Sequence, residues 1–119
     1  MGLRERYPKL ANLIGSYFHQ DWKLGYFWGE NEPHYAPVVR FYKTHNPPPS
    51  VEQAAREFKE FLALDFDEGR LEDALYHHLG LGVMPSHWGL TFRGWLEEVL
   101  KILEEPMEKT KKQFIPLFR

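Results

Sequence analysis

Apolar side chains recur at spacings of three and four residues in five separate stretches of this chain, and no stretch alternates apolar and polar residues as a strand would. The clearest stripe consists of Phe92, Trp95, Leu96, Val99, Leu100 and Leu103. Each stretch is about 12 residues long, which is too short for a helix that is stable alone in water. The pattern therefore predicts an all-α fold, a compact bundle of about five short amphipathic helices.

Local signals place the first two helices. Pro8 suits a first helical turn, and a stripe of apolar residues then continues to Phe18. A second helix is expected from Tyr35, or only from Pro37, to about Tyr42. The prolines of "HNPPPS" end it, because proline lacks the N–H that a helix interior needs.

Capping residues place the other three helices. Ser50 followed by Gln53 predicts a capping box, in which each side chain accepts a hydrogen bond from a free N–H of the first turn. Asp65 or Asp67 is expected to cap the fourth helix, which Gly80 closes. The fifth helix follows a cap at Thr91, with Leu90 and Trp95 at the two positions of a hydrophobic staple.

The chain ends in a segment of different character, "EEPMEKTKKQFIPLFR". Pro106 breaks the fifth helix, so we expect one helical domain over residues 1–105 and a tail over residues 106–119. The stretch "FIPLF" holds four apolar side chains that nothing local can bury. The tail is either a strap that docks on the domain or an arm that binds a partner.

Length and composition exclude several classes of protein. The 119 residues correspond to one domain, and the absence of cysteine excludes disulfides, thiol catalysis and cysteine-ligated zinc. A formal net charge of −2 argues against general nucleic-acid binding, which needs a basic face. Neither a secretory signal nor a membrane-spanning run is predicted. We therefore expect a cytoplasmic protein with no membrane contact.

The histidines and serines give no sign of an active site. His77 and His78 are adjacent, so on a helix they point about 100° apart and do not share a metal ion easily. His78 falls on an apolar stripe, which favours a buried core histidine. No serine lies in a G-x-S-x-G turn. No cofactor or metal is expected, and the alternatives that stay open are a small metal-dependent enzyme, in which His77, His78 or His87 converge with nearby acids, and a regulatory module that uses the tail.

Acidic residues are concentrated between Glu52 and Asp73. Eight acids stand there against three bases, which gives this stretch a net charge of −5 and leaves +3 on the rest of the chain. A surface of this sign attracts a basic partner and speeds its association. The alternative is an ordinary hydrated surface on two helices with capping acids.

The block "YFHQDW" follows the first stripe at the place where a helix ends. It consists of Tyr17, Phe18, His19, Gln20, Asp21 and Trp22. Donors from His19 and Gln20 are expected to satisfy the last helical carbonyls, and Trp22 to hold the exiting chain against the core. Asp21 is unfavourable at a helix C-terminus, so we expect a compensating partner for it.

Two segments carry a resemblance to a known family. "YPKLANLIGSYFHQDW" resembles the opening of the small immunity proteins of bacterial contact-dependent growth inhibition systems, and "LTFRGWLEEVLKIL" resembles their closing helix. The matching residues are Tyr7, Pro8, Leu10, Gly15, Tyr17 to Trp22, Trp95 and Leu96. The resemblance runs from about Tyr7 to Leu103, whereas the middle segment "GYFWGENEPHYAP" departs from the family pattern.

The resemblance implies a function that the residues alone leave open. Such proteins are cytosolic helical domains that bind the C-terminal toxin domain delivered by a neighbouring cell and neutralise it by occlusion, without chemistry and without binding nucleic acid directly. Many of these toxins are nucleases with basic clefts. The residues expected to contact a toxin are therefore Glu60, Asp65, Asp67, Glu68, Glu72 and Asp73. The block of residues 17–22, with Trp95, is expected to hold the fold.

Overall fold

The computed structural model describes residues 2–25, 28 and 32–113, and throughout these residues it contains helices and no strand. The α-helices in chain order are α1 (Leu3–Arg6), α2 (Pro8–Asn12), α3 (Tyr35–His45), α4 (Pro48–Ala63), α5 (Glu68–Asp73), α6 (Phe92–Glu104) and α7 (Met107–Gln113). Two π-helical turns, η1 (Leu13–Tyr17) and η3 (Ala74–His78), extend α2 and α5. The prediction of an all-α fold is confirmed.

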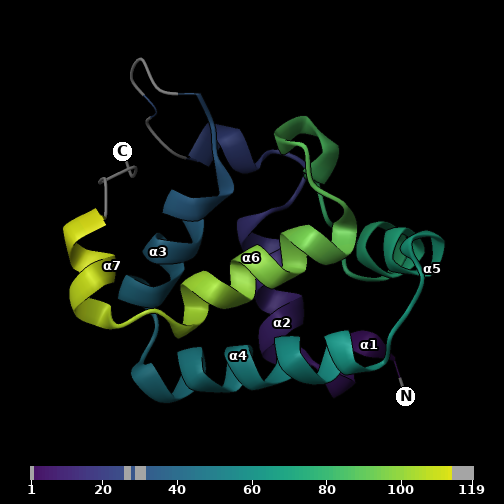
Figure 1. The fold of residues 1–119 in the computed structure, drawn as a ribbon, viewed down its shortest axis with the longest axis horizontal. Helices are drawn as coiled ribbons and strands as arrows, with labels where there is room; N and C mark the ends of the chain where they lie inside the picture. Colours follow the sequence, from purple (N-terminus) through teal and green to yellow (C-terminus); the bar gives the residue numbers. More distant parts are fainter. Residues whose placement is uncertain (1, 26–27, 29–31, 114–119) are drawn as a thin grey trace.

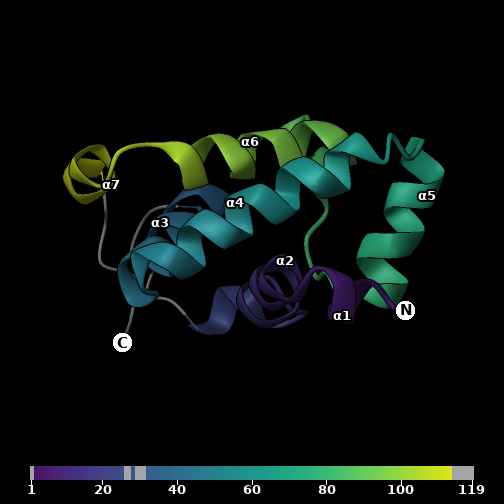
Figure 2. The same cartoon turned by 90° about the horizontal axis from the view of Figure 1, so that it is seen from below.

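The helices are arranged around α4 and α6, which are the two longest. In Figure 1, α6 crosses the middle of the molecule, with α4 along its lower edge and α3 behind it. Figure 2 shows α1 and α2 on the side of α4 that faces away from α6, with α5 at one end of the molecule and α7 at the other. The largest fully buried side chains are those of Trp95, Tyr7, Tyr42, Phe18, Phe58 and Phe61.

The first predicted helix is confirmed at its start and differs at its end. It begins at Pro8 and passes into the π-helical turn η1, and the short helix α1, which the sequence did not indicate, precedes it. Gly15 lies where η1 closely approaches the end of η3, and this approach explains why the position holds a glycine. A Cβ at Gly15 would lie 2.9 Å from the carbonyl oxygen of Leu79, so a larger residue would push the two turns apart.

The predicted capping box at Ser50 is wrong. Helix α4 begins two residues earlier, at Pro48, and Ser50 lies inside its first turn, where its N–H donates to the Pro47 carbonyl at 2.9 Å. Prolines fit these first positions because the N–H groups there have no helical partner anyway. Gln53 instead donates from Nε2 to Glu57 Oε2 at 2.7 Å.

The fourth predicted helix is capped by Asp67 and not by Asp65. The Asp67 carboxylate accepts the N–H of Arg70 at 2.8 Å, whereas Asp65 occupies the left-handed turn before it, with φ of 54°.

The prediction of a buried His78 is wrong. The π-helical turn η3 adds a residue to the turn, so Leu79 takes the buried position and the His78 side chain is 59% exposed.

The remaining helix starts agree with the sequence. Thr91 caps α6, because its Oγ1 accepts the N–H of Gly94 at 2.9 Å. Helix α3 begins at Tyr35, and the cap is His34, whose Nδ1 accepts the N–H of Ala36 at 3.1 Å. Of the helices in the described ranges, none is long and apolar enough to cross a membrane.

The first half of the tail forms α7, which packs against α3. The apolar stretch "FIPLF" lies outside the described residues. The division of the chain at residue 105 therefore stays a prediction.

Candidate functional site

The "YFHQDW" block lies against the aromatic core. Trp22 is 2% exposed, and its ring centroid lies 5.7 Å from that of Phe18 and 6.1 Å from that of Trp88. Phe18 in turn meets the Trp95 ring edge-on at 5.2 Å. Trp22 thus joins the end of the first helical segment to the core of the bundle.

The polar residues of the block act differently from the prediction. The His19 side chain accepts where a donor was expected, since its Nδ1 takes the N–H of Asp21 at 3.0 Å. The N–H of Gly82 reaches the free Phe18 carbonyl instead, at 2.6 Å, and a Cβ on Gly82 would collide with the His19 carbonyl group. Gln20 and Asp21 are exposed, and within residues 2–25, 28 and 32–113 no ion pair to Asp21 is present.

Three of the six predicted contact acids have structural partners at the junction of α5 and α6. Asp67 caps α5, as described above. Glu68 reaches across to the first turn of α6, where its two carboxylate oxygens accept the N–H groups of Phe92 at 2.7 Å and Arg93 at 3.0 Å. Asp65 pairs with the Arg93 guanidinium at 3.2 Å. Each of these carboxylates interacts with the positive end of a helix or with a cation of the same chain.

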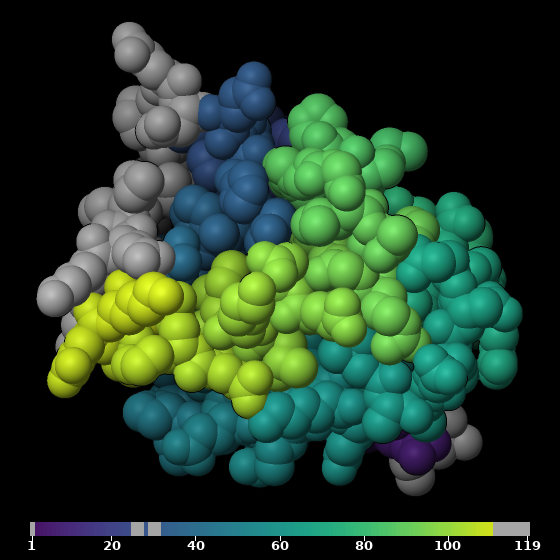
Figure 3. Space-filling view, viewed as in Figure 1, coloured from purple at the N-terminus to yellow at the C-terminus, as the bar shows by residue number. Residues whose placement is uncertain are grey.

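The other three predicted acids cap no helix in the part of the chain that the structure describes. Glu60 lies on the exposed face of α4, and Glu72 and Asp73 are exposed at the end of α5. Asp73 has His78 Nε2 at 3.4 Å, in a pair that is open to solvent. Figure 3 shows α5 at the edge of the molecule beside α6. Asp67 and Asp73 line one surface hollow of about 750 Å³ there, and Glu60 is not among the described residues that line it.

Glu57, the most buried acid among the described residues, was not predicted as a separate feature. It is 5% exposed, and its Oε1 accepts the N–H groups of Lys9 at 2.8 Å and Leu10 at 3.0 Å. A signal was present in the sequence, because Glu57 follows Ala54 by three residues and precedes Phe61 by four, which places it on the apolar face of α4.

A second buried polar group that sequence reasoning missed is Lys43 of α3. The side chain is 3% exposed, and Nζ donates to the carbonyls of Ile102 at 2.8 Å and Glu105 at 2.6 Å and to Thr110 Oγ1 at 2.7 Å. Burial lowers the pKa of this amine, and the nearby Glu105 carboxylate opposes that effect. Lys43 follows Val39 by four residues, so the helical period again indicated the buried face.

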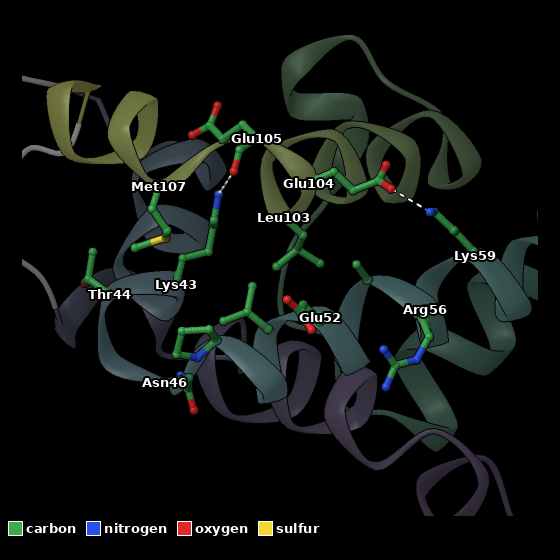
Figure 4. A pocket seen from close by; sticks show the side chains of 13 residues that line it. Lys43, Thr44, Asn46, Glu52, Arg56, Lys59, Leu103, Glu104, Glu105 and Met107 are labelled. Atoms are coloured by element: carbon green, nitrogen blue, oxygen red, sulfur yellow. Dashed lines mark hydrogen bonds and ion pairs between the residues drawn. The ribbon is translucent and has the colours of Figure 1, made fainter.

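A cavity of about 680 Å³ lies between α4 and the end of α6 (Figure 4). Its apolar wall is formed by Val51, Ala55 and Leu103, and Met107 stands at one end. The rim is charged and includes Lys59, which pairs with Glu104 at 2.6 Å. A smaller hollow, of about 240 Å³, lies between Trp22 and Trp88.

The metal-enzyme alternative gains no support. Across the described part of the chain, no three histidine, aspartate or glutamate side chains gather in a way that could hold a metal ion. His78 turns toward Asp73, and the ring of His87 lies 5.9 Å from that of Trp88. The three histidines of the alternative therefore do not converge on a shared site in the described residues.

Comparison with known proteins identifies the family. A family model described as CdiI immunity protein matches residues 6–103. No curated protein matches the chain. A chain of a solved structure titled "Crystal structure of CdiA-CT/CdiI complex from Y. kristensenii 33638" is similar in fold, with a TM-score of 0.74 and 24% identity over 88% of this chain and 100% of that one. Because the family match spans well over half of its length, the chain belongs to the CdiI immunity protein family.

Proposed function

We propose that this protein binds the C-terminal toxin domain of a contact-dependent growth inhibition protein of the CdiA type and neutralises it by covering it. The observation that carries the proposal is the family match over residues 6–103. The fold agrees with this role, since the similar solved chain belongs to a CdiA-CT/CdiI complex. We further propose that the protein acts in the cytoplasm, and that its action on the toxin is occlusion and not catalysis.

The acidic stretch between Glu52 and Asp73 supports a specific contact surface. Its net charge of −5 would draw a basic toxin surface toward α5 and the end of α4. The six predicted acids differ in the contacts that they make within the chain. Asp65, Asp67 and Glu68 cap a helix or pair with Arg93, whereas Glu60, Glu72 and Asp73 cap no helix among the described residues, and the pair of Asp73 with His78 is open to solvent. The latter three are therefore the acids that we assign first to the toxin contact.

Direct binding tests this proposal. The purified chain is titrated with the CdiA C-terminal domain encoded in the same genome, carrying an inactivating mutation, and the Kd is measured at low and moderate salt. Glu60→Lys combined with Glu72→Lys should weaken binding by at least tenfold and reduce its salt dependence, because two favourable charges become unfavourable. Reversal of Asp67 or Glu68 is a poor test, since either change also removes a helix cap.

Matched variants outside the acidic stretch provide the control. Glu97→Lys combined with Glu108→Lys changes the net charge equally at exposed positions of α6 and α7 and should leave the Kd within about twofold. Equal weakening by both pairs would mean that only net charge matters, and the surface assignment would be wrong. If the native chain and the toxin domain form no complex, and co-expression does not restore growth, the proposed function itself fails.

A further inference from the structure

We propose that α7 is a strap that opens and closes one end of the cavity between α4 and α6, and that buried Lys43 is the latch that holds it shut. This inference concerns a conformational change within the chain and does not depend on the proposed function. It covers residues 105–113, which lie beyond the family match.

The side-chain amine of Lys43, the proposed latch, binds three segments of the chain. The three hydrogens of the Lys43 ammonium go to Ile102 in the last turn of α6, to Glu105 in the link and to Thr110 in α7. An ammonium group has three donors, so every one of them is used. Two of the acceptors are carbonyls at the C-terminal end of α6, where a cation is favourable for the helix dipole.

The side chain of Glu105 closes the network. Its Oε1 accepts Arg40 Nε at 2.9 Å and the Thr110 hydroxyl at 2.9 Å. The Thr110 hydroxyl therefore accepts from Lys43 and donates to Glu105 at the same time. Arg40 and Lys43 both lie on α3, so these contacts attach α7 to α3.

The described side chains of α7 hold it in place mainly through polar contacts. Of its side chains that the structure describes, from Met107 to Thr110, only Thr110 is buried, while Met107 is 36% exposed. Helix α6, by contrast, buries Trp95, Leu96 and Val99. A seven-residue helix has little stability of its own. Detachment of α7 should therefore require much less free energy than unfolding of the domain.

The position of α7 links the latch to the cavity. Met107 and Glu105 line the cavity at the end where Lys43 lies, and Figure 4 shows Met107 beside Lys43 with Leu103 next along the cavity. The residue before Pro106 is already extended, with φ of −67° and ψ of 148° at Glu105, so the link can act as a hinge. Release of α7 would move Met107 away and widen access to Ala55.

Limited proteolysis of the full chain tests the latch. Thr110→Val keeps the shape of the side chain and removes its hydroxyl, so both hydrogen bonds of that group are lost. Trypsin should then cut after Lys109 at least tenfold faster than in the native chain, with no change in the rate of cleavage after Arg56 in α4. Thr44→Val, at an exposed threonine on the same side of the cavity, is the matched control and should leave both rates unchanged.

Thiol labelling tests the opening of the cavity. The chain has no cysteine, so Ala55→Cys places a single reporter on the cavity wall. Adding Thr110→Val should raise its labelling rate severalfold. Ala74→Cys, at a buried position away from this cavity, should label at the same slow rate with and without Thr110→Val.

Three results would overturn the inference. Unchanged cleavage after Lys109 in Thr110→Val would show that the latch does not hold α7. An equal rise in cleavage after Arg56 and Lys109 would show that α7 opens only when the whole domain unfolds. Faster release of α7 without faster labelling at Ala55→Cys would show that the strap does not control access to the cavity.

Discussion

Glu57 in the middle of α4 caps the N-terminus of α2. Its Oε1 lies 2.8 Å from the N of Lys9 and 3.0 Å from the N of Leu10, which are free donors in the first turn after Pro8. The side chain of Tyr7, the residue at the cap position, makes no capping hydrogen bond. One carboxylate from a distant helix therefore supplies what a local aspartate or serine usually supplies, and it fixes the packing of α2 on α4.

Glu57→Ala should lower the free energy of unfolding by about 2 kcal/mol, because the partly buried N–H of Lys9 and the buried N–H of Leu10 lose a charged acceptor. Glu57→Gln should cost less, since an amide oxygen in the place of Oε1 still accepts both N–H groups, and only the charge and the acceptor for Gln53 are lost. Urea unfolding followed by far-UV circular dichroism measures both. Glu60→Ala, three residues away on the exposed face of α4, is the control and should change stability by less than about 0.5 kcal/mol. Equal effects at the two positions would contradict the assigned role of Glu57.

Trp22→Ala should lower the free energy of unfolding by about 3 kcal/mol or more, as expected for a buried aromatic side chain. The ring contacts Phe18, Trp28 and Trp88, so its removal leaves a cavity at the centre of the aromatic cluster. Leu24→Ala, two residues later at a side chain that is 69% exposed, should have almost no effect. An unchanged melting temperature for Trp22→Ala would show that the cluster adds nothing to stability.

The sequence was sufficient for features that depend on neighbours in the chain. The helical period, the start at Pro8 and the cap at Thr91 are local, and the structure confirms them. Features set by long-range packing were missed. The π-helical turn that exposes His78 has no signal in the sequence, and the close contact of Gly15 with the carbonyl of Leu79, just after that turn, is evident only once the fold is known.

The same limit applies to the candidate site. The net charge of residues 52–73 follows from the sequence, but the charge alone does not identify the carboxylates that have no partner within the chain. Glu57 and Glu68 each cap a helix that starts far away in the chain, and Asp67 caps its own. The cap at Asp67 is local and the sequence indicated it, whereas the partners of Glu57 and Glu68 follow from the packing of α4 on α2 and of α5 on α6, which no local pattern encodes.

Tyr42→Phe should raise the free energy of unfolding by about 1 kcal/mol, because the buried Tyr42 hydroxyl has no partner among the described residues. Burial, with smaller contributions from Tyr17 and Glu57, raises the pKa of Tyr42 to about 12. Tyr76→Phe is the matched control. The Tyr76 hydroxyl donates to the Val83 carbonyl at 2.9 Å, so this variant should be less stable by about 1 kcal/mol. Equal losses in the two variants would show that Tyr42 does find a partner, such as a buried water.

Acid should weaken the network that holds α7. Burial by itself raises the pKa of the Glu105 carboxyl, but hydrogen bonds from Arg40 and Thr110, together with the charges of Arg40 and Lys43, outweigh burial and leave the pKa below the ordinary value of 4.5. A carboxyl whose pKa is lower in the folded state contributes stability above its unfolded pKa. That contribution is lost as the pH falls from about 4.5 through the lowered folded pKa.

Glu105→Gln should therefore melt at a lower temperature than the native chain at pH 7, and the difference should shrink as the pH falls below about 4.5. Thermal unfolding of both proteins between pH 7 and pH 3 measures this. Glu104→Gln removes the neighbouring acid, whose pair with Lys59 is open to solvent, so its effect should be small at every pH. A difference between Glu105→Gln and the native chain that stays constant down to pH 3 would mean that the ionised Glu105 carboxylate does not stabilise the fold, and the network would then owe its strength to Lys43 alone.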